Sequence, residues 1–290
     1  MISLVRRATA LCVLGAALTA CGTTGAEQTP RPAPSAPAPS PTPSRTPTLA
    51  PGPAGLTPVF EHGPRTDGTK DGKKDGKTVA LTFDADMTAD QGPRAASGER
   101  FDNPALIATL RKLKVPATVF MTGRWAEEYP DEARSIGRDP QFEVANHSYS
   151  HYAYTDDCYG LPTVSKDHMR SDLERAYTAF EKAGVPNPMP YFRFPGGCYD
   201  DTALEALSAT GVTAVQWDVV SGDAFATDAD AVTRQVLDGV RPGSVVVMHC
   251  TRSAAPVTEE VVRAVVPELR RQGYRFVKVS QLIGAANGRG

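Results

Sequence analysis

One run of residues organises the rest of this sequence: Thr78-Val79-Ala80-Leu81-Thr82-Phe83, followed by Asp84-Ala85-Asp86. The first six residues are mostly apolar or β-branched and predict a buried strand. Acids directly after such a strand are placed where a parallel sheet carries its chemistry, so Asp84 and Asp86 are the first candidates for a functional site. The alternative is that the two acids only cap the turn after the strand.

Downstream of this strand, apolar and amphipathic segments alternate. Asn103 followed by Pro104 predicts a helix start, because Asn caps a helix and Pro fits its first turn. Repeated strand-then-helix units imply a parallel sheet, and this many units favour closure or near-closure into an α/β barrel. We expect further strands at 117–121, 141–145, 190–194, 213–217, 244–248 and 275–279, and helices at 104–112, 125–136, 165–182, 201–208, 228–237 and 258–271.

The first residues have the pattern of an export signal. Arg6 and Arg7 precede an apolar run at 8–18 that is too short to span a bilayer. The run ends in Leu18-Thr19-Ala20-Cys21, which resembles the lipobox of bacterial lipoproteins, where the cysteine is acylated and becomes the first mature residue. We expect a signal peptide at 1–20 and a lipid anchor on Cys21. The alternative is an ordinary signal peptide with a coincidental cysteine.

A polar, low-complexity region follows the signal. Residues 25–58 are dominated by Pro, Ala, Ser and Thr, with too little apolar surface to offset the entropy of ordering. A tandem Lys-Asp-Gly-Lys repeat at 70–77 prolongs it. We predict an extended linker at 21–77 and one domain at 78–285. Loss of residues 1–20 leaves 29 basic against 33 acidic residues, a formal charge of −4, so nothing indicates a nucleic-acid partner.

Two of the five histidines lie four residues apart in Asn146-His147-Ser148-Tyr149-Ser150-His151. Their small and polar neighbours suit imidazoles turned toward solvent, and the spacing can place both rings on one metal ion. Such a pair also arises by chance. The predicted strands end close to other polar side chains, and the architecture should gather these at one edge of the sheet. They are Asp84, Asp86, Arg193, Asp218 and His249.

Five short motifs in order resemble the motif series of the NodB-like polysaccharide deacetylases, carbohydrate esterase family 4, over about residues 79–283. Taken singly, Arg193 could be a surface residue and His249 a core histidine; five motifs in order are more specific. The resemblance implies a distorted (β/α) barrel that removes N- or O-acetyl groups from polymeric sugars with one divalent metal, usually zinc. The motifs are Thr82-Phe83-Asp84-Ala85-Asp86, His147-Ser148-Tyr149-Ser150-His151, Arg193-Phe194-Pro195-Gly196-Gly197, Trp217-Asp218 through Asp223, and Val247-Met248-His249.

The resemblance also implies roles. His147 and His151 would bind the metal, Asp84 would be the general base and His249 the general acid. Arg193 would hold the base, and Asp223 would orient an arginine or a histidine. These roles suit amide hydrolysis, because a metal with one open position makes its bound water more acidic and the departing amine must be protonated. Backbone N–H groups around 196–198 are candidates for stabilising the oxyanion.

The sequence departs from the family pattern. The family has adjacent aspartates in the first motif, the second being the third metal ligand, whereas here Ala85 holds that position and Asp86 follows. We expect Asp86 to reach the metal through a shifted turn; the alternative is an ion held by the two histidines and water. Other changes alter the shape of the substrate site. Gly196 replaces an aromatic residue, the usual Asp-Trp reads Asp223-Ala224 before Phe225, and Val247 replaces a leucine.

Three cysteines remain in the exported domain, Cys158, Cys198 and Cys250, and thiols outside the cytoplasm often oxidise. Each follows a motif closely, so all three can gather near the site, and one intramolecular pair at most can form. We favour Cys158 with Cys198, which would tie the loop after the histidines to the rim. His62 and His168 belong to no motif, and we expect them to be structural or solvated.

These observations predict a lipid-anchored, metal-dependent deacetylase on the outer face of the cytoplasmic membrane, acting as a monomer on an acetylated polysaccharide. Peptidoglycan N-acetyl sugars are the nearest polymer to a tethered enzyme. We expect one Zn²⁺, with Co²⁺, Mn²⁺ or Ni²⁺ as alternatives. Two other functions remain open: a catalytically inactive glycan-binding lipoprotein, supported by the altered first motif, and an esterase of O-acetyl polymers such as xylan.

Overall fold

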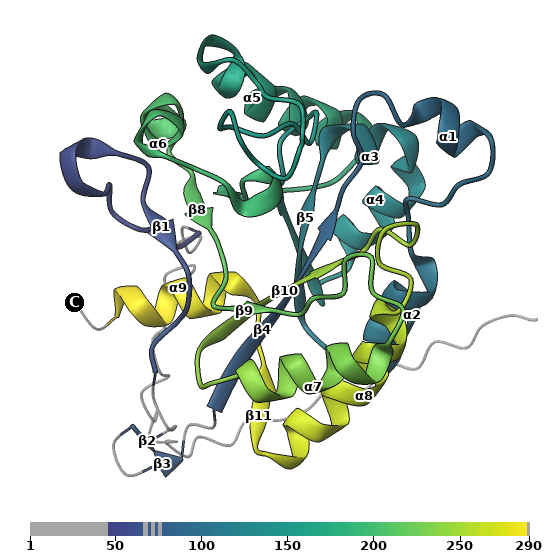
Figure 1. Cartoon of the computed structure of the whole chain (residues 1–290). Helices are drawn as coiled ribbons and strands as arrows, with labels where there is room; N and C mark the ends of the chain where they lie inside the picture. Colours follow the sequence, from purple (N-terminus) through teal and green to yellow (C-terminus); the bar gives the residue numbers. More distant parts are fainter. Residues whose placement is uncertain (1–45, 66–68, 71–72, 75–76, 289–290) are drawn as a thin grey trace, which may run out of the picture. The chain divides into compact units, whose positions relative to one another are not determined.

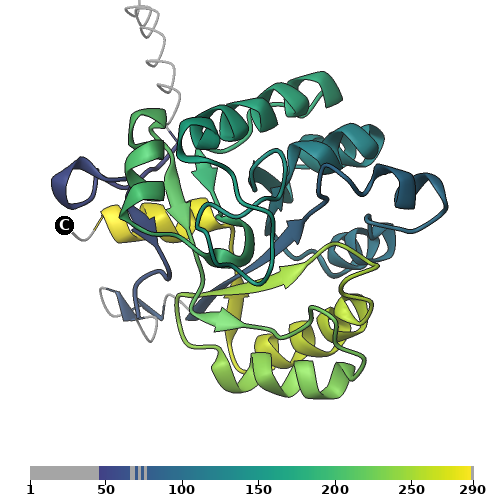
Figure 2. The same cartoon turned by 45° about the horizontal axis from the view of Figure 1, so that its top comes forward.

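The computed structural model describes residues 46–65, 69–70, 73–74 and 77–288. Nine strands in this part of the chain form one parallel sheet along the path β1-β8-β7-β6-β5-β4-β10-β9, with β11 pairing to β4. Helices surround the curved sheet (Figures 1 and 2), so the expected distorted (β/α) barrel is confirmed. The strands of this sheet are β1 (Val59–Phe60), β4 (Lys77–Ala85), β5 (Ala117–Met121), β6 (Phe142–Asn146), β7 (Tyr191–Phe192), β8 (Thr213–Val215), β9 (Val219–Val220), β10 (Ser244–His249) and β11 (Tyr274–Phe276).

The helices lie between the strands, as the alternating pattern predicted. Asn103 caps α2 by accepting the N–H of Leu106 at 3.1 Å, and Gly184 ends α5 with a φ of 76°. The helices are α1 (Gly92–Ala96), α2 (Pro104–Leu113), α3 (Gly123–Glu128), α4 (Pro130–Arg138), α5 (Lys166–Ala183), α6 (Asp201–Leu207), α7 (Ala229–Gly239), α8 (Thr258–Arg271) and α9 (Val279–Asn287), with 3₁₀ turns η1 (Pro53–Gly55), η2 (Pro195–Gly197) and η3 (Ser208–Thr210).

Strand β4 separates two hydrophobic cores. Val79, Leu81, Phe83 and Ala85 pack into the core that includes residues of the outer helices α2, α3, α4, α7 and α8. Ala80 faces the other way, into a core with residues from β5, β6, β7, β8 and β10. Because side chains alternate along a strand, the even-numbered positions of β4 point toward the interior of the barrel.

Helix α9 packs against this interior core and was not predicted. The sequence pattern suggested a strand at 275–279, whereas β11 ends at Phe276 and a helix begins at Val279. Val279, Leu282 and Ile283 are buried in the interior core. Their spacing of three and four residues is that of a helix face, a signal that the sequence analysis overlooked.

Several boundaries differ from expectation for local reasons. The helix expected at 125–136 is two helices, α3 and α4, because Pro130 lacks the N–H that would continue the first one. The strands expected at 190–194 and 213–217 are shorter, and β9 was not predicted. Short strands carry little periodic pattern, so their ends are poorly determined by sequence.

The predicted linker extends too far along the chain. Residues 46–65 pack onto the domain: β1 pairs with β8, and the N–H of Gly63 donates to the carbonyl oxygen of Gly243 at 2.8 Å. Phe60 is 4% exposed in the interior core. One aromatic side chain and an edge strand thus anchor a segment whose overall composition suggested a tether. In the repeat, β2 (Thr69–Lys70) pairs with β3 (Lys73–Lys74).

Two predictions concern residues outside the described ranges, the signal peptide at 1–20 and the lipid anchor on Cys21. Within the described residues, none of the helices has the length and apolar character needed to cross a membrane.

Candidate active site

Most of the residues proposed from sequence meet at the carboxyl edge of the sheet. His249 is the last residue of β10 and is the register partner of Asp84 on β4. His147 follows β6 directly, and Arg193 follows β7. Parallel strands end at the same edge, so four strands bring these side chains together from distant parts of the sequence.

A buried arginine holds Asp84. Nη1 of Arg193 donates to Oδ1 of Asp84 at 2.6 Å, and the two residues are 0% and 4% exposed. Nε and Nη2 donate to the carbonyl oxygens of Val215 and Gln216 at 3.2 and 3.4 Å. The guanidinium also lies 3.9 Å from the ring centroid of Phe120. A buried ion pair requires its other donors to be satisfied, so these contacts let Arg193 orient the carboxylate.

His147 is buried, with 2% of its surface exposed, contrary to the expectation of an imidazole turned toward solvent. Its Nδ1 lies 2.9 Å from the carbonyl oxygen of Arg193. A carbonyl only accepts, so the proton belongs on Nδ1 and Nε2 keeps its lone pair. Nε2 lies 3.7 Å from Oδ2 of Asp84. Burial lowers the pKa of His147 to about 4, although Asp84 opposes it, so the ring is neutral at pH 7.

The loop after His147 turns His151 back toward it. Ser148 and His151 have φ values of 70° and 57°, a left-handed backbone that is costly for residues other than glycine. Two hydrogen bonds support the loop: Ser148 N–H donates to Oδ1 of Asn146 at 2.8 Å, and His151 N–H donates to Oγ of Ser148 at 2.9 Å. The centroids of the His147 and His151 rings lie 5.0 Å apart. A loop, and not a helix, therefore brings the two imidazoles of the four-residue spacing together.

Asp86 lies beside His151, with Oδ2 3.5 Å from Nε2 of the imidazole. It shares the interior side with Asp84, whereas Ala85 is buried in the outer core, because side chains alternate at this strand end. Thr251 holds Asp86: its hydroxyl accepts the Asp86 N–H at 3.1 Å and donates to Oδ1. Burial alone would raise the pKa of Asp86, but His151, His249 and the Thr251 hydrogen bond lower it overall.

Thr251 is a site residue that the sequence analysis missed, and its position two residues after His249 was the available signal. The resemblance assigned that motif only its histidine. The structure shows that the same strand end also positions the shifted acid of the first motif.

The donor atoms at this edge suit a divalent metal. Among the described residues, no three His, Cys, Asp or Glu side chains form a complete metal site, and the acids and imidazoles are related in pairs at 3.5 and 3.7 Å. His147 nevertheless presents a neutral ring with Nε2 free, and Asp86 presents a carboxylate of lowered pKa. Imidazole and carboxylate donors are those that zinc accepts. His147, His151 and Asp86 are therefore the residues that would hold the ion.

A second carboxylate holds His249. Oδ1 of Asp223 lies 2.8 Å from Nδ1 of His249, and Oδ2 accepts the His249 backbone N–H at 2.8 Å. The hydroxyls of Ser221 and Thr258 donate to the same carboxylate at 2.8 and 2.6 Å. Burial lowers the pKa of His249, but the hydrogen bond and charge of Asp223, together with Asp86 and Asp84, raise it to about 9. The ring is therefore protonated at pH 7.

One site expectation is wrong, and one of the oxyanion candidates is already hydrogen-bonded. Asp218 lies before β9, at the opposite edge of the sheet, where its carboxylate pairs with Arg65 at 2.7 Å and accepts the Val245 N–H at 2.7 Å. The carboxylate of Asp218 therefore binds the amino end of β10. The Gly197 N–H, one of the oxyanion candidates, donates to the carbonyl oxygen of Phe194 at 2.8 Å, so it is engaged within a turn.

The structure contains the favoured disulfide between Cys158 and Cys198, which spans 40 residues, while Cys250 is a free and buried thiol. The disulfide ties the loop after His151 to the turn after Arg193. His62 and His168 are exposed.

A cavity of about 230 Å³ opens beside Asp86 and His151. Leu161 and Phe225 contribute apolar walls to it. Phe225 is 84% exposed with a φ of 59°, so an aromatic ring is held in solvent at the mouth of the site. Although the sequence departs from the family motifs around the substrate site, Phe225 still gives this cavity an aromatic wall.

The fold and the edge at which the site lies define a (β/α) barrel with a candidate active site at the carboxyl ends of its strands. The sequence model of the polysaccharide deacetylase family matches residues 71–215, and the chain belongs to this family. It is a polysaccharide deacetylase.

Among its relatives, a chitooligosaccharide deacetylase of Bradyrhizobium sp. (strain ANU 289) is 27% identical over 218 residues, covering 70% of this chain and 92% of the relative. A peptidoglycan-N-acetylglucosamine deacetylase of Bacillus cereus (strain ATCC 14579) is 27% identical over 205 residues, covering 70% and 67%. A crystal structure of a peptidoglycan N-acetylglucosamine deacetylase superposes with a TM-score of 0.62 at 24% identity, covering 78% of this chain and 92% of the other.

Proposed function

We propose that this protein removes N-acetyl groups from the amino sugars of peptidoglycan, using one divalent metal ion bound by His147, His151 and Asp86. We further propose that Cys21 anchors it at the outer face of the cytoplasmic membrane. The names of the Bacillus cereus relatives support the substrate. The apolar run before Cys21 and the lipobox-like sequence support the location.

The chain positions a base and an acid on neighbouring strands, and this observation carries the proposal. Asp84 and His249 are register partners on β4 and β10. Arg193 orients the first, and Asp223 keeps the second protonated at pH 7. Amide hydrolysis requires removal of a proton from water and delivery of a proton to the departing nitrogen. The two side chains can perform these two transfers.

The reaction then follows from these positions. When bound, the metal ion supplies a Lewis acid that makes a water molecule more acidic and polarises the acetamido carbonyl. Asp84 accepts a proton as the water oxygen forms a bond to the carbonyl carbon. His249 then gives its proton to the sugar nitrogen as the C–N bond breaks, which releases acetate and a free amine. Arg193 and Asp223 act through Asp84 and His249 and are positioning residues.

Acetate release from N-acetylglucosamine pentasaccharide and from purified peptidoglycan tests this function. We expect release that stops with a chelator and returns when Zn²⁺ is added. Acetylated xylan is the matched O-acetyl substrate, and faster release from it would favour the esterase alternative. Folded, metal-loaded protein that binds pentasaccharide and releases no acetate from any of the three would identify a glycan-binding protein and contradict the proposal.

The location requires its own experiment. Cell fractionation of wild type and Cys21→Ala should place the wild type with the membrane and release the variant. A lipid-modified N-terminal cysteine in the mass spectrum of the mature protein would support the anchor. If the wild type and Cys21→Ala fractionate alike and no lipid mass is found, the anchor is contradicted and the protein is a secreted enzyme.

A further inference from the structure

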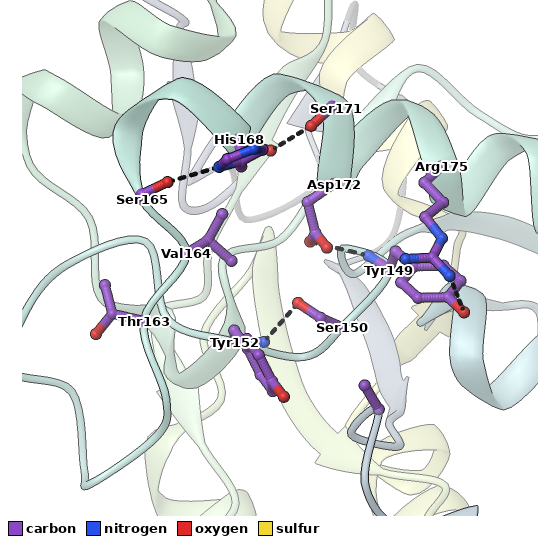
Figure 3. Close-up of a pocket in the computed structure, with 11 residues that line it drawn as sticks. Tyr149, Ser150, Tyr152, Thr163, Val164, Ser165, His168, Ser171, Asp172 and Arg175 are labelled. Carbon is purple, nitrogen blue, oxygen red and sulfur yellow. Dashed lines mark hydrogen bonds between the residues drawn. The ribbon is translucent and has the colours of Figure 1, made fainter.

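A second and larger pocket lies next to the histidine loop. Its volume is about 520 Å³, against about 230 Å³ for the cavity beside Asp86 and His151. Ser150 and Tyr152, the two chain neighbours of His151, form one wall, and α5 forms the facing wall (Figure 3). Ala89, three residues beyond Asp86, also lines it. The pocket is thus lined by residues that lie close in sequence to two of the proposed metal ligands, His151 and Asp86.

The two charged residues of this pocket have opposite signs, and protein groups hold both in place. Arg175 stacks on the ring of Tyr149, 3.5 Å from its centroid, and Nη2 donates to the Tyr149 hydroxyl at 2.8 Å. The carboxylate of Asp172 accepts the Tyr149 N–H and the Tyr154 hydroxyl, both at 3.2 Å. One arginine and one aspartate give these two groups no net charge, so the pocket suits an uncharged ligand.

The remaining lining is rich in hydroxyl groups and has two apolar surfaces. Ser165 pairs with Nδ1 of His168 at 2.8 Å, and Ser171 donates to the carbonyl oxygen of His168 at 2.9 Å. Within the described residues, the Tyr152 hydroxyl makes no hydrogen bond. Val164 and the Tyr152 ring supply apolar contact. Pockets that combine apolar walls with a few oriented polar groups bind ligands that have both kinds of surface, as a pyranose ring does.

We propose that this pocket binds one neutral pyranose unit of the polysaccharide, a neighbour of the unit whose acetamido group lies at His147 and His151. The inference rests on the proposed deacetylase function and adds a specificity site to it. Ser150 and Tyr152 adjoin His151, so occupancy of the pocket holds the chain in register with the reaction centre. The protein therefore prefers long oligomers over short ones.

Ser171→Trp tests this proposal. Ser171 is exposed on α5, so an indole fits there without disturbing the core and fills the pocket. Thr178→Trp is the matched control, because Thr178 is exposed seven residues further along the same helix and does not line the pocket. Acetate release is measured on N-acetylglucosamine disaccharide and pentasaccharide, and pentasaccharide binding by calorimetry on chelator-treated protein.

We expect Ser171→Trp to lower kcat/KM for the pentasaccharide about tenfold, the effect of one lost subsite, through KM, with the disaccharide rate unchanged. Thr178→Trp should match the wild type on both. An unchanged ratio of pentasaccharide to disaccharide rates in Ser171→Trp would overturn the subsite. If the wild type releases no acetate, calorimetry still decides: weaker pentasaccharide binding by Ser171→Trp supports the subsite while the deacetylase function fails, and equal binding overturns both.

Discussion

Replacing Asp223 with Asn removes the charge that keeps His249 protonated while preserving side-chain size. The carboxylate has four protein donors: the ring Nδ1 and backbone N–H of His249 and the hydroxyls of Ser221 and Thr258. Its hydrogen bond and charge are the largest contributions that raise the pKa of His249 to about 9. Without them, burial dominates, and the pKa should return to its ordinary value of about 6.5 or below.

The size of the effect depends on pH. With a pKa of about 9, roughly 90% of His249 carries its proton at pH 8; with a pKa of about 6.5, roughly 3% does. At pH 6 the two fractions are roughly 100% and roughly 75%. If His249 is the general acid, Asp223→Asn should lose about twentyfold more activity at pH 8 than at pH 6. The basic limb of the profile should move down by about 2 to 3 pH units.

The assay is kcat/KM for acetate release from N-acetylglucosamine pentasaccharide between pH 5.5 and 9.5. Ser221→Ala is the control, because it removes one hydrogen bond to Asp223 and keeps the charge, so its basic limb should stay near pH 9. A uniform loss of activity in Asp223→Asn, with the limb unmoved, would refute the reasoning.

The pH dependence of the free energy of unfolding gives a second measure of the His249 proton. The folded pKa of His249 lies above the unfolded value, so its stabilisation is complete below about pH 6.5 and is lost as pH rises through about 9. Urea unfolding of the wild type should show this decline, and Asp223→Asn should lack it.

Other variants separate the remaining roles. Asp84→Asn should abolish turnover while retaining metal, whereas His147→Ala should lose the metal itself; metal analysis of the folded proteins checks both, and near-normal turnover of Asp84→Asn would remove it as the base. Arg193→Lys should lower kcat by about 10- to 100-fold more than it changes KM, because lysine cannot bond Asp84 and two carbonyl oxygens together. Cys198→Ser should reduce the free energy of unfolding by about 4 kcal/mol, the chain-entropy value for a 40-residue loop; three reactive thiols in unreduced wild type would contradict the disulfide.

Much of the fold was predictable because its signals are local. Strand β5 has the expected bounds, and Asn103 caps α2 as its sequence indicated. Periodicity and capping act within a few residues. The docking of residues 46–65 and helix α9 depended instead on surfaces supplied by the barrel, and composition or a few apolar positions did not reveal them.

By itself, the sequence determined which side chains are available for chemistry and that most of them follow parallel strands, since both properties are written in the order of residues. The tertiary structure decided their state. His147 is neutral with Nε2 free because a carbonyl oxygen from Arg193 reaches its other nitrogen. His249 is protonated because a carboxylate 26 residues away meets it. Asp218 faces the other edge because β9 begins after it. Burial and long-range partners set protonation and orientation, and only the folded chain brings them together.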